Sequence, residues 1–283
     1  MFEKKRIRVG ILGLGIIGSR IAGHLRDAGF AVSVWNRTPK PEPNFLGSPA
    51  EVAQASDILQ LFVADPKAVF EVLDALDDAL TSRHIVVCSS TIGREATLEA
   101  AKRVQSKGAR FLDTPFTGTK GAAEKRQLVY YIGGDDDTFQ AVKPVLEAVS
   151  KAIVPIGEIG QAALVKVLTN VLSAAAIEVL AETLAVLKAE GMDPAIMGKA
   201  LEHHGARSGM SDLKLPKLLQ GDFEDTHFSL KHMLKDVQFG LDEGAHLHLD
   251  LPVTEAAAKA LREGRDAGWS DLDFSCVMKR YTK

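Results

Sequence analysis

The sequence predicts an α/β protein in which an N-terminal doubly wound sheet is joined by one long helix to an all-α C-terminal domain. Short apolar runs alternate with helical patterns from Arg6 to Val154, which is typical of βαβ units and a mainly parallel sheet. Residues 161–190 then form a segment without Gly or Pro, rich in Ala, Leu and Val. Beyond it no strand pattern remains. We expect domains at 1–160 and 191–283, with a connecting helix at 161–190.

Each element follows from the same patterning. The connection 38–48 contains three prolines and therefore predicts a short loop in place of a crossover helix. The expected strands are 7–13, 30–35, 57–63, 84–90, 109–115 and 128–134, and the clearest helices between them are 17–28, 66–79 and 94–107.

Composition narrows the class of protein. Apolar residues make up 46% and charged residues 25% of the 283 positions, as in ordinary soluble proteins. A net charge of −3 gives no electrostatic reason to bind nucleic acid, and two cysteines favour a reducing compartment. The first ten residues are too charged for a signal peptide, and Lys166, Glu178 and Glu182 make the long helix too polar for a simple membrane span. We expect a cytoplasmic protein that binds neither nucleic acid nor a membrane.

A glycine pattern sits where the first strand turns into the first helix. Gly13, Gly15 and Gly18 satisfy G-x-G-x-x-G in this strand–turn–helix context. The first glycine permits the tight turn, the second lets a pyrophosphate approach the backbone, and the third lets helix and strand pack closely. This predicts a Rossmann dinucleotide site. The candidate phosphate-binding residues are Gly13, Leu14, Gly15, Ile16, Ile17 and Gly18.

The end of the second strand indicates which nicotinamide cofactor binds. An NAD site normally has Asp or Glu there, on the ribose 2′-hydroxyl. This chain has Asn36, Arg37 and Thr38, with Lys40 close by. A guanidinium can bind a 2′-phosphate bidentately, whereas a carboxylate would repel it. NADP(H) is therefore favoured over NAD(H), although Arg37 could also be a plain solvated turn residue.

Four separated motifs, in order, give the chain a whole-length resemblance. They are "GLGIIGSRIA", "DTPFTGTKGAAEKRQL", "GEIGQAALVKVLTN" and "LKDVQFGLDEG". Together they resemble the cofactor, substrate, catalytic and late Lys-Asp motifs of the β-hydroxyacid dehydrogenase family. That family contains 3-hydroxyisobutyrate dehydrogenase and the glyoxylate/succinic semialdehyde reductases. The resemblance implies an oxidoreductase that interconverts a small β-hydroxy acid and its aldehyde or keto acid.

The resemblance implies catalytic roles for Lys166 and Asn170. Lys166 matches the family's lysine and would act as general acid/base at the substrate oxygen. Asn170 follows at i+4, so both side chains project from one face of a helix, and it would bind the substrate by hydrogen bonding. The alternative for Lys166 is a lysine whose stem lies along the helix surface.

The substrate motif departs from the commonest family pattern. Thr117, Gly118 and Thr119 stand where many members have Ser-Gly-Gly, and their N–H groups could bind a substrate carboxylate as a backbone nest. The pair Thr119-Lys120 is closer to the glyoxylate/succinic semialdehyde reductase branch. Ala162 stands where the family commonly has glycine.

Further cofactor contacts are expected at the carboxyl ends of other strands. Val63 and Ala64 follow the third strand, and Thr91 follows the fourth. By resemblance, Lys235 would close over the nicotinamide with Asp236 beside it. The alternative is an exposed helical pair.

The expected function is an NADP(H)-dependent reductase acting on a small carboxylate-bearing aldehyde or hydroxy acid. An imine reductase and a non-catalytic NADP-binding module remain as alternatives. The histidines do not have the spacing of a closed zinc site, so no metal is expected. A long apolar helix needs cover on all sides, which favours a homodimer or homotetramer.

Overall fold

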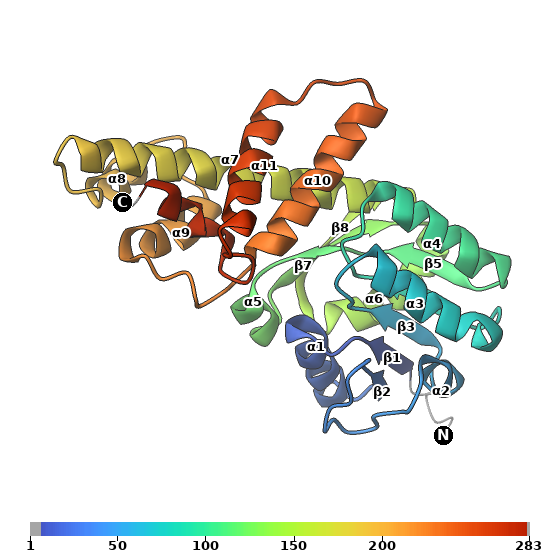
Figure 1. The fold of residues 1–283 in the computed structure, drawn as a ribbon. Coiled ribbons are helices and arrows are strands. Elements are labelled where there is room, and N and C mark those ends of the chain that lie inside the picture. The colour runs from blue at the N-terminus through green and yellow to red at the C-terminus, as the bar shows by residue number, and fades with distance from the viewer. Residues whose placement is uncertain (1–6, 282–283) are drawn as a thin grey trace. The chain divides into compact units, whose positions relative to one another are not determined.

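The computed structural model describes residues 7–281. The chain divides into two compact units, with Lys166 ending the first and Val167 beginning the second. The first unit is built on one sheet (Figure 1). Its strands are β1 (Arg8–Leu12), β2 (Ala31–Trp35), β3 (Ile58–Leu61), β4 (Ile85–Cys88), β5 (Arg110–Asp113), β6 (Phe116–Thr117), β7 (Leu128–Gly133) and β8 (Ser150–Gly157).

The strand order is β2-β1-β3-β4-β5-β7-β6, with β8 paired to β7. The strands β2, β1, β3, β4 and β5 are parallel to one another, whereas β7 runs antiparallel to β5 and β6. The sheet is therefore mixed at one side and Rossmann-like at the other. The chain places β2 on one side of β1 and then crosses to place β3 on the other side. Open α/β sheets bind ligands at such a switch point, here between β1 and β3.

Helices cover both faces of the sheet because the strands are buried on both sides. Along β4, Ile85 and Val87 join one apolar cluster, and Val86 and Cys88 join the other. The first cluster includes side chains of α1 and α6, and the second those of α2, α3 and α4. The helices of this unit are α1 (Ile16–Asp27), α2 (Pro49–Ala55), α3 (Pro66–Leu76), η1 (Asp77–Ala79), α4 (Arg94–Ser106), α5 (Lys120–Glu124) and α6 (Asp136–Glu147).

The first part of the connection after β2 forms a loop, as its prolines predict, but the short helix α2 follows before β3, so the expectation that no helix occupies this crossover was wrong. Residues 38–48 contain no helix, and Phe45 forms an isolated parallel bridge with Val34 of β2. Arg26 of α1 anchors the loop through an ion pair with Glu42 (Nη1 to Oε2, 3.0 Å). The short helix α2 begins only at Pro49, after the Ser48 N-cap.

Five elements of the first unit lie outside the strands and helices expected from the sequence: α2, α5, α6, β6 and β8. The strand β8 alternates poorly and most of its residues are partly or fully exposed, because it pairs only with β7. A strand with so little burial lacks the apolar run by which the others are found.

The second unit is all-helical and follows the long helix, so the predicted fold class is confirmed. Its core joins apolar side chains of α7, α9, α10, α11 and the C-terminal η2. The helices are α7 (Gln161–Ala189), which begins in the first unit, α8 (Ile196–Glu202), α9 (Gly209–Gln220), α10 (Leu230–His246), α11 (Pro252–Asp266) and η2 (Phe274–Tyr281).

A buried ion pair crosses this core. Lys214 of α9 places Nζ 2.7 Å from both carboxylate oxygens of Asp273, and both side chains are essentially inaccessible. Asp273 also accepts from the backbone N–H groups of His227 and Phe228 and from Ser275. Burial opposes ionisation of Asp273, but the Lys214 ammonium and the Ser275 donors outweigh it and hold the pKa of Asp273 below its usual range.

By length and composition alone, α7 could cross a membrane, with a mean hydropathy of 1.7 in its most apolar window. The expectation that its charged residues make it too polar was therefore wrong on that criterion. Of that window, 39% is buried inside the protein, and Ile177, Ala181 and Leu184 belong to the helical core. Part of the apolar surface of α7 is thus buried by packing within the protein.

Candidate active site

The glycine turn follows β1, and each glycine meets a different spatial demand. Gly13 has φ +107°, and a Cβ there would lie 2.4 Å from the carbonyl oxygen of Phe62. A Cβ on Gly18 would lie 2.0 Å from the carbonyl oxygen of Gly13, so helix and turn are in close contact. Gly15 has nothing within 4 Å of its Cβ position, which leaves its backbone open to an approaching group.

The first turn of α1 suits an anion. Gly15 is the N-cap residue and offers no side-chain cap, and the first turn contains no acidic residue. The N–H groups at a helix start carry partial positive charge and bind phosphates when no side chain occupies them. These features fit a dinucleotide pyrophosphate at Gly15, Ile16 and Ile17.

The end of β2 is tied to the glycine turn. The Oδ1 of Asn36 accepts from the N–H of Leu14 at 2.9 Å, and its Nδ2 donates to the carbonyl of Thr38 at 2.7 Å. The Nζ of Lys40 donates to the carbonyl of Leu14. Arg37 is 81% exposed at its side chain and makes a long contact (3.5 Å) with Glu71. Two cations therefore stand where an NAD-binding fold carries a carboxylate.

Hydrogen bonds also order the carboxyl ends of β3 and β4. The Oγ of Ser90 accepts from the N–H of Val63 at 2.9 Å and so links the two loops. Asp65 caps α3 by accepting from the N–H of Ala68 at 2.8 Å. Val63, Ala64 and Thr91 in these loops are expected to contact the cofactor, and the side chain of Ser90, which precedes Thr91, holds the two loops together.

The substrate motif forms a strand end and a short helix. Thr117 lies in β6 opposite Val129 of β7. Gly118 has φ +138°, and a Cβ there would come within 2.7 Å of Leu128, so the turn requires glycine. The hydroxyl of Thr119 accepts from the N–H of Ala122 at 3.3 Å and caps α5. Thr119 thus has a local structural role as well as its expected one.

The helix α5 also contacts α1, the helix that follows the glycine turn. Arg20 pairs with Glu124, with Nη2 to Oε1 at 2.7 Å, and His24 Nε2 lies 3.0 Å from the carbonyl of Ala123. The hydrogen bond from Arg20 lowers the pKa of Glu124. The segments expected to bind substrate and cofactor are therefore joined side by side in the first unit.

On α7, both expected catalytic residues are largely buried. Lys166 and Asn170 are each 8% exposed and lie one turn apart. The Nδ2 of Asn170 donates to Oδ2 of Asp236 at 2.6 Å, which fixes which end of the amide faces Asp236. The Nζ of Lys235 lies 2.8 Å from the other oxygen of Asp236. The late Lys-Asp motif is therefore a partly buried pair and not an exposed one.

Asp113, at the carboxyl end of β5, is a buried polar residue that the sequence reasoning did not select. Its Oδ2 accepts from the N–H groups of Gly160 and Ala163, at 3.1 and 2.9 Å. Burial raises the pKa of Asp113 to about 7, although those two N–H donors oppose the shift. The signal that could have found it is its place at a strand's carboxyl end. The neighbouring thiol of Cys88 is inert, because burial raises its pKa to about 12.

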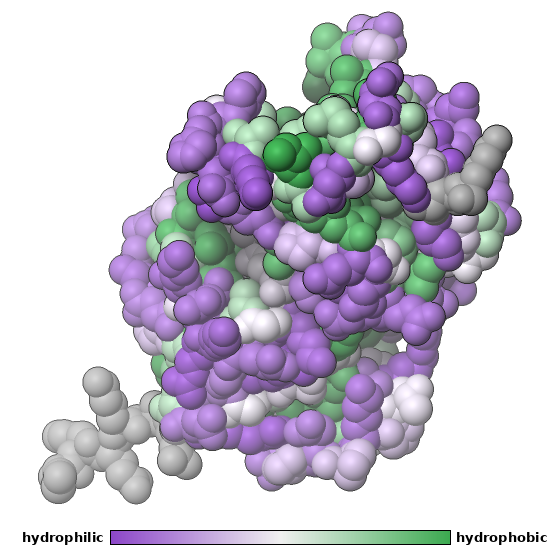
Figure 2. All heavy atoms as spheres, turned by 90° about the vertical axis from the view of Figure 1, so that its left-hand side faces the viewer, coloured by the Kyte–Doolittle hydropathy of each residue, from purple (hydrophilic) through white to green (hydrophobic). Residues whose placement is uncertain are grey.

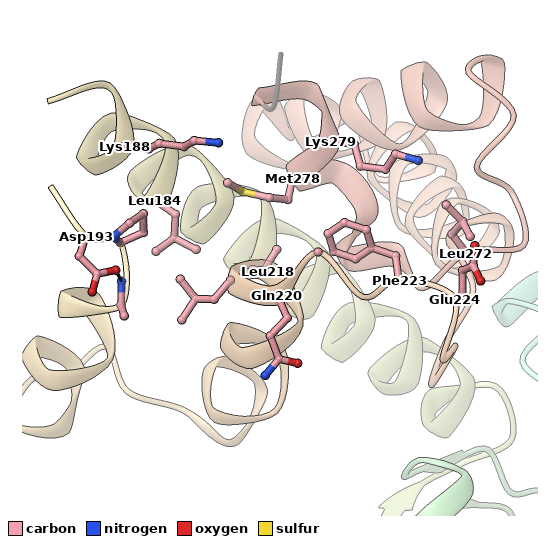
Figure 3. A pocket seen from close by; sticks show the side chains of 14 residues that line it. Leu184, Lys188, Asp193, Leu218, Gln220, Phe223, Glu224, Leu272, Met278 and Lys279 are labelled. Carbon is pink, nitrogen blue, oxygen red and sulfur yellow. Dashed lines mark hydrogen bonds between the residues drawn. The ribbon is translucent and has the colours of Figure 1, made fainter. Parts of the chain in front are cut away.

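The second unit also contains a cavity. It has a volume of about 660 Å³ and is lined from α7, α9, the turn at Asp193 and the C-terminal segment, with Leu184, Leu218 and Met278 around it (Figure 3). Figure 2, which faces the α8–α9 end, shows apolar patches among hydrophilic side chains. None of the residues expected to be functional lines this cavity.

Two family models cover nearly the whole chain. Residues 8–157 match the NAD-binding domain of 6-phosphogluconate dehydrogenase. Residues 160–281 match the NAD-binding model of NADP-dependent 3-hydroxyisobutyrate dehydrogenase. The chain belongs to the 3-hydroxyisobutyrate dehydrogenase-like family. The resemblance read from the four motifs is confirmed.

Relatives of this 3-hydroxyisobutyrate dehydrogenase-like protein include enzymes and a nuclear factor. Chloroplastic glyoxylate/succinic semialdehyde reductase 2 of Arabidopsis thaliana is 29% identical, over 98% of this chain and 80% of the relative. Cytokine-like nuclear factor N-PAC of Mus musculus is 30% identical over 97% of this chain, which spans 51% of that protein. The Mycobacterium tuberculosis 3-hydroxyisobutyrate dehydrogenase structure with L-serine shares the fold, with TM-score 0.88 and 23% identity over 98% of this chain and 100% of its own.

The family places the protein among dehydrogenases and reductases that act on CH–OH groups, with domains that bind a nicotinamide cofactor. The open backbone at Gly15 and the uncapped start of α1 fit such a cofactor.

Proposed function

We propose that this 3-hydroxyisobutyrate dehydrogenase-like protein is an NADPH-dependent reductase of small aldehyde or keto acids, reversible as a hydroxy acid dehydrogenase. The observation that carries the proposal is the buried Lys166 one helical turn from Asn170, whose amide is oriented by Asp236. A lysine that only lies along a helix surface keeps its ammonium in water, whereas Lys166 is largely buried. A proton donor benefits from a fixed, partly desolvated position of this kind.

The cofactor preference rests on charge at the end of β2. Asn36 uses its side chain to bond Leu14 and Thr38, so it supplies no negative charge to repel a 2′-phosphate. The exposed guanidinium of Arg37 and the ammonium of Lys40 can both meet that phosphate, and Arg37 can do so bidentately. NADPH is therefore favoured over NADH.

The substrate class follows from the turn at Thr117–Thr119 and from the relatives. The left-handed Gly118 turns the backbone so that neighbouring N–H groups can bind a carboxylate. The Arabidopsis reductase is named for glyoxylate and succinic semialdehyde, both of which are aldehydes that carry a carboxylate. We infer that an aldehyde with a carboxylate, of a size similar to glyoxylate or succinic semialdehyde, binds at the turn Thr117–Thr119.

In the proposed reaction NADPH supplies the hydride. Lys166, as the ammonium, donates a proton from Nζ to the substrate's carbonyl oxygen as charge develops there, and takes it back in the reverse direction. Asn170 orients the substrate oxygen by hydrogen bonding. Asp236 holds Asn170 in the required orientation, because its carboxylate can only accept and therefore selects the amide's NH₂ end.

The test follows NADPH oxidation by absorbance with glyoxylate, succinic semialdehyde, methylmalonate semialdehyde, tartronate semialdehyde and a cyclic imine, with NADH in parallel. We expect turnover of at least one aldehyde acid. Lys166→Met should lower kcat by at least about 100-fold while NADPH still binds. Lys188→Met, on the same helix but exposed, is the matched control and should retain activity.

Turnover of the imine alone would indicate an imine reductase instead. Tight NADPH binding with no turnover of any compound would favour a non-catalytic NADP-binding module. Loss of folding in Lys166→Met, shown by circular dichroism, would assign the lysine a structural role.

A first prediction concerns the cofactor. Arg37→Ala should weaken NADPH binding by about tenfold or more, because a charge-assisted contact of roughly 1.4 kcal/mol or more is lost. NADH binding should change little. Titration of intrinsic fluorescence with each cofactor measures both; equal weakening would remove the 2′-phosphate role from Arg37.

We also propose that the protein is a homodimer or homotetramer assembled through α7. Leu168, Leu172, Val179 and Val186 are exposed large apolar residues on this helix, and Leu172 is 71% exposed. An apolar helical face needs cover. Light scattering should give an oligomer for the natural chain and a smaller species for Leu172→Glu.

A further inference from the structure

The start of α7 lacks a cap of its own. Gly160, the residue before the helix, has φ +87° and no side chain to accept from the first N–H groups. Such groups need partners when they are buried. The N–H of Gln161 bonds the carbonyl of Glu158 and that of Leu164 bonds the carbonyl of Gly160, both at 3.1 Å. The N–H groups of Gly160 and Ala163 bond a group from elsewhere in the fold.

The partner comes from a strand about 50 positions earlier in the sequence. One carboxylate oxygen of Asp113, at the end of β5, accepts from both Gly160 and Ala163. Asp113 is 1% exposed. This contact does for α7 what a local Ser, Thr or Asp does at other helices, such as Asp135 at the start of α6. It also bonds the helix to the sheet.

The packing around this contact leaves little freedom. A Cβ on Gly133, at the end of β7, would lie 3.2 Å from Oδ2 of Asp113 and 3.3 Å from the Cβ of Ala162. Ala162 is fully buried. The carbonyl oxygen of Glu158 would lie closer still, at 2.6 Å, so position 133 requires glycine, and the first turn of α7 lies directly against the ends of β5 and β7.

We propose that Asp113 is a positioning residue for Lys166. Lys166 follows Ala163 by three residues, less than one helical turn, so the bond that fixes the Ala163 N–H also fixes the backbone that carries the lysine. Asp113 itself does not touch the reacting groups. Its carboxylate sets the direction in which Nζ leaves the helix relative to the carboxyl ends of the strands.

This inference rests on the proposed catalytic role of Lys166. Displacing a catalytic group by about 1 Å can lower the rate by about 100-fold without abolishing binding. Loss of the cap should therefore reduce kcat more than cofactor affinity. An acceptor that keeps the same geometry without a charge should restore most of the activity.

The experiment compares Asp113→Ala, Asp113→Asn and the control Asp135→Ala, which removes an ordinary cap from α6 in the same unit. Amide hydrogen exchange at Gly160 and Ala163 is measured by NMR, together with kcat and the NADPH dissociation constant. In Asp113→Ala we expect exchange at Ala163 to rise about tenfold and kcat to fall about 10- to 100-fold, with NADPH affinity within about twofold.

Asp113→Asn should keep kcat within about threefold, because its side-chain oxygen can still accept both N–H groups. Asp135→Ala should raise exchange only at α6 and leave kcat unchanged. If Asp113→Ala loosens Ala163 but keeps kcat, or if Asp113→Asn loses as much activity as Asp113→Ala, the proposal is overturned. Should Asp113→Ala fail to fold, Asp113→Ser, whose hydroxyl cannot reach as far, replaces it.

If the natural protein turns over no aldehyde acid, the proposed function fails but the positioning can still be tested. Reductive methylation with ¹³C-formaldehyde and cyanoborohydride labels the reactive lysines of the chain. The methyl resonance of Lys166 is identified as the one absent from Lys166→Met, and it reports the surroundings of that side chain. A resonance that shifts in Asp113→Ala and returns in Asp113→Asn would support positioning. One that does not move in either variant would contradict it.

Discussion

Two buried aspartates, one in each unit, meet different surroundings. Asp113 of the sheet unit and Asp273 of the helical unit are both almost fully inaccessible. Asp273 faces the ammonium of Lys214, and its pKa is lowered. Asp113 has two backbone N–H donors on one oxygen, and burial raises its pKa to about 7.

The difference shows that burial alone does not determine the charge of a carboxyl group. Desolvation acts on both residues in the same direction. A full positive charge at 2.7 Å offsets it for Asp273, whereas dipolar donors do so only partly for Asp113. One carboxylate is a fixed structural charge, and the other changes ionisation near neutral pH.

The largest expected effect comes from breaking the buried pair. Lys214→Met leaves Asp273 charged and unpaired in the core, so the free energy of unfolding should fall by about 3–5 kcal/mol. Urea denaturation followed by circular dichroism measures it. The matched control is Lys217→Met on the same helix, whose partner Asp225 is mostly exposed, and it should cost clearly less. Equal losses in the free energy of unfolding would show that the buried pair Lys214–Asp273 stabilises the protein no more than the pair Lys217–Asp225.

A second prediction concerns the pH dependence of Asp113. Because its folded pKa lies above the unfolded value of 3.8, the folded protein binds more protons than the unfolded chain between those values. Stability from this group therefore falls as pH rises from about 4 to about 7. Asp113→Asn cannot ionise and should be more stable than the natural protein above pH 7, by up to about 4 kcal/mol, because the pKa of Asp113 is raised from 3.8 to about 7.

That advantage should shrink as the pH is lowered toward 4, where Asp113 is neutral in the natural protein. Parallel denaturation series at pH 5 and pH 8 test this directly. A constant difference between the two proteins at both pH values would show that Asp113 keeps one protonation state throughout, and the contrast with Asp273 would disappear.

The smallest effect is expected at an exposed pair. Arg103 lies 3.1 Å from Glu99 and 3.2 Å from Asp74, with all three side chains largely accessible to solvent. Arg103→Ala should change the free energy of unfolding by less than about 1 kcal/mol, and addition of salt should reduce even that. A thermal melt at two salt concentrations provides the comparison; a loss as large as that for Lys214→Met would contradict it.

Local patterns made much of the fold predictable. Gly13 must be glycine because a Cβ would collide with the carbonyl of Phe62, just after β3, and Gly18 because a Cβ would collide with the carbonyl of Gly13. Both requirements appear in the sequence as the glycine pattern. The prolines of 38–48 excluded a helix for the same local reason. The segment 161–190 became α7 almost to the residue, because no Gly or Pro interrupts it.

Other features were not predictable because their cause lies far away in the chain. The strand β8 is mostly exposed and is ordered by its pairing with β7. The contact of Arg20 with Glu124 joins residues more than 100 positions apart.

The sequence by itself determined the features that depend on neighbours within a few residues. These are the alternation of strands and helices, the glycine turn, the cations after β2 and the helix that carries Lys166 and Asn170. Only the tertiary structure decided that Asp113 caps α7, that Asp236 orients Asn170 and that Lys214 neutralises Asp273. Each of these is a buried polar group whose partner is supplied by another element. The need for a partner comes from desolvation, and which residue provides it depends on how the chain folds.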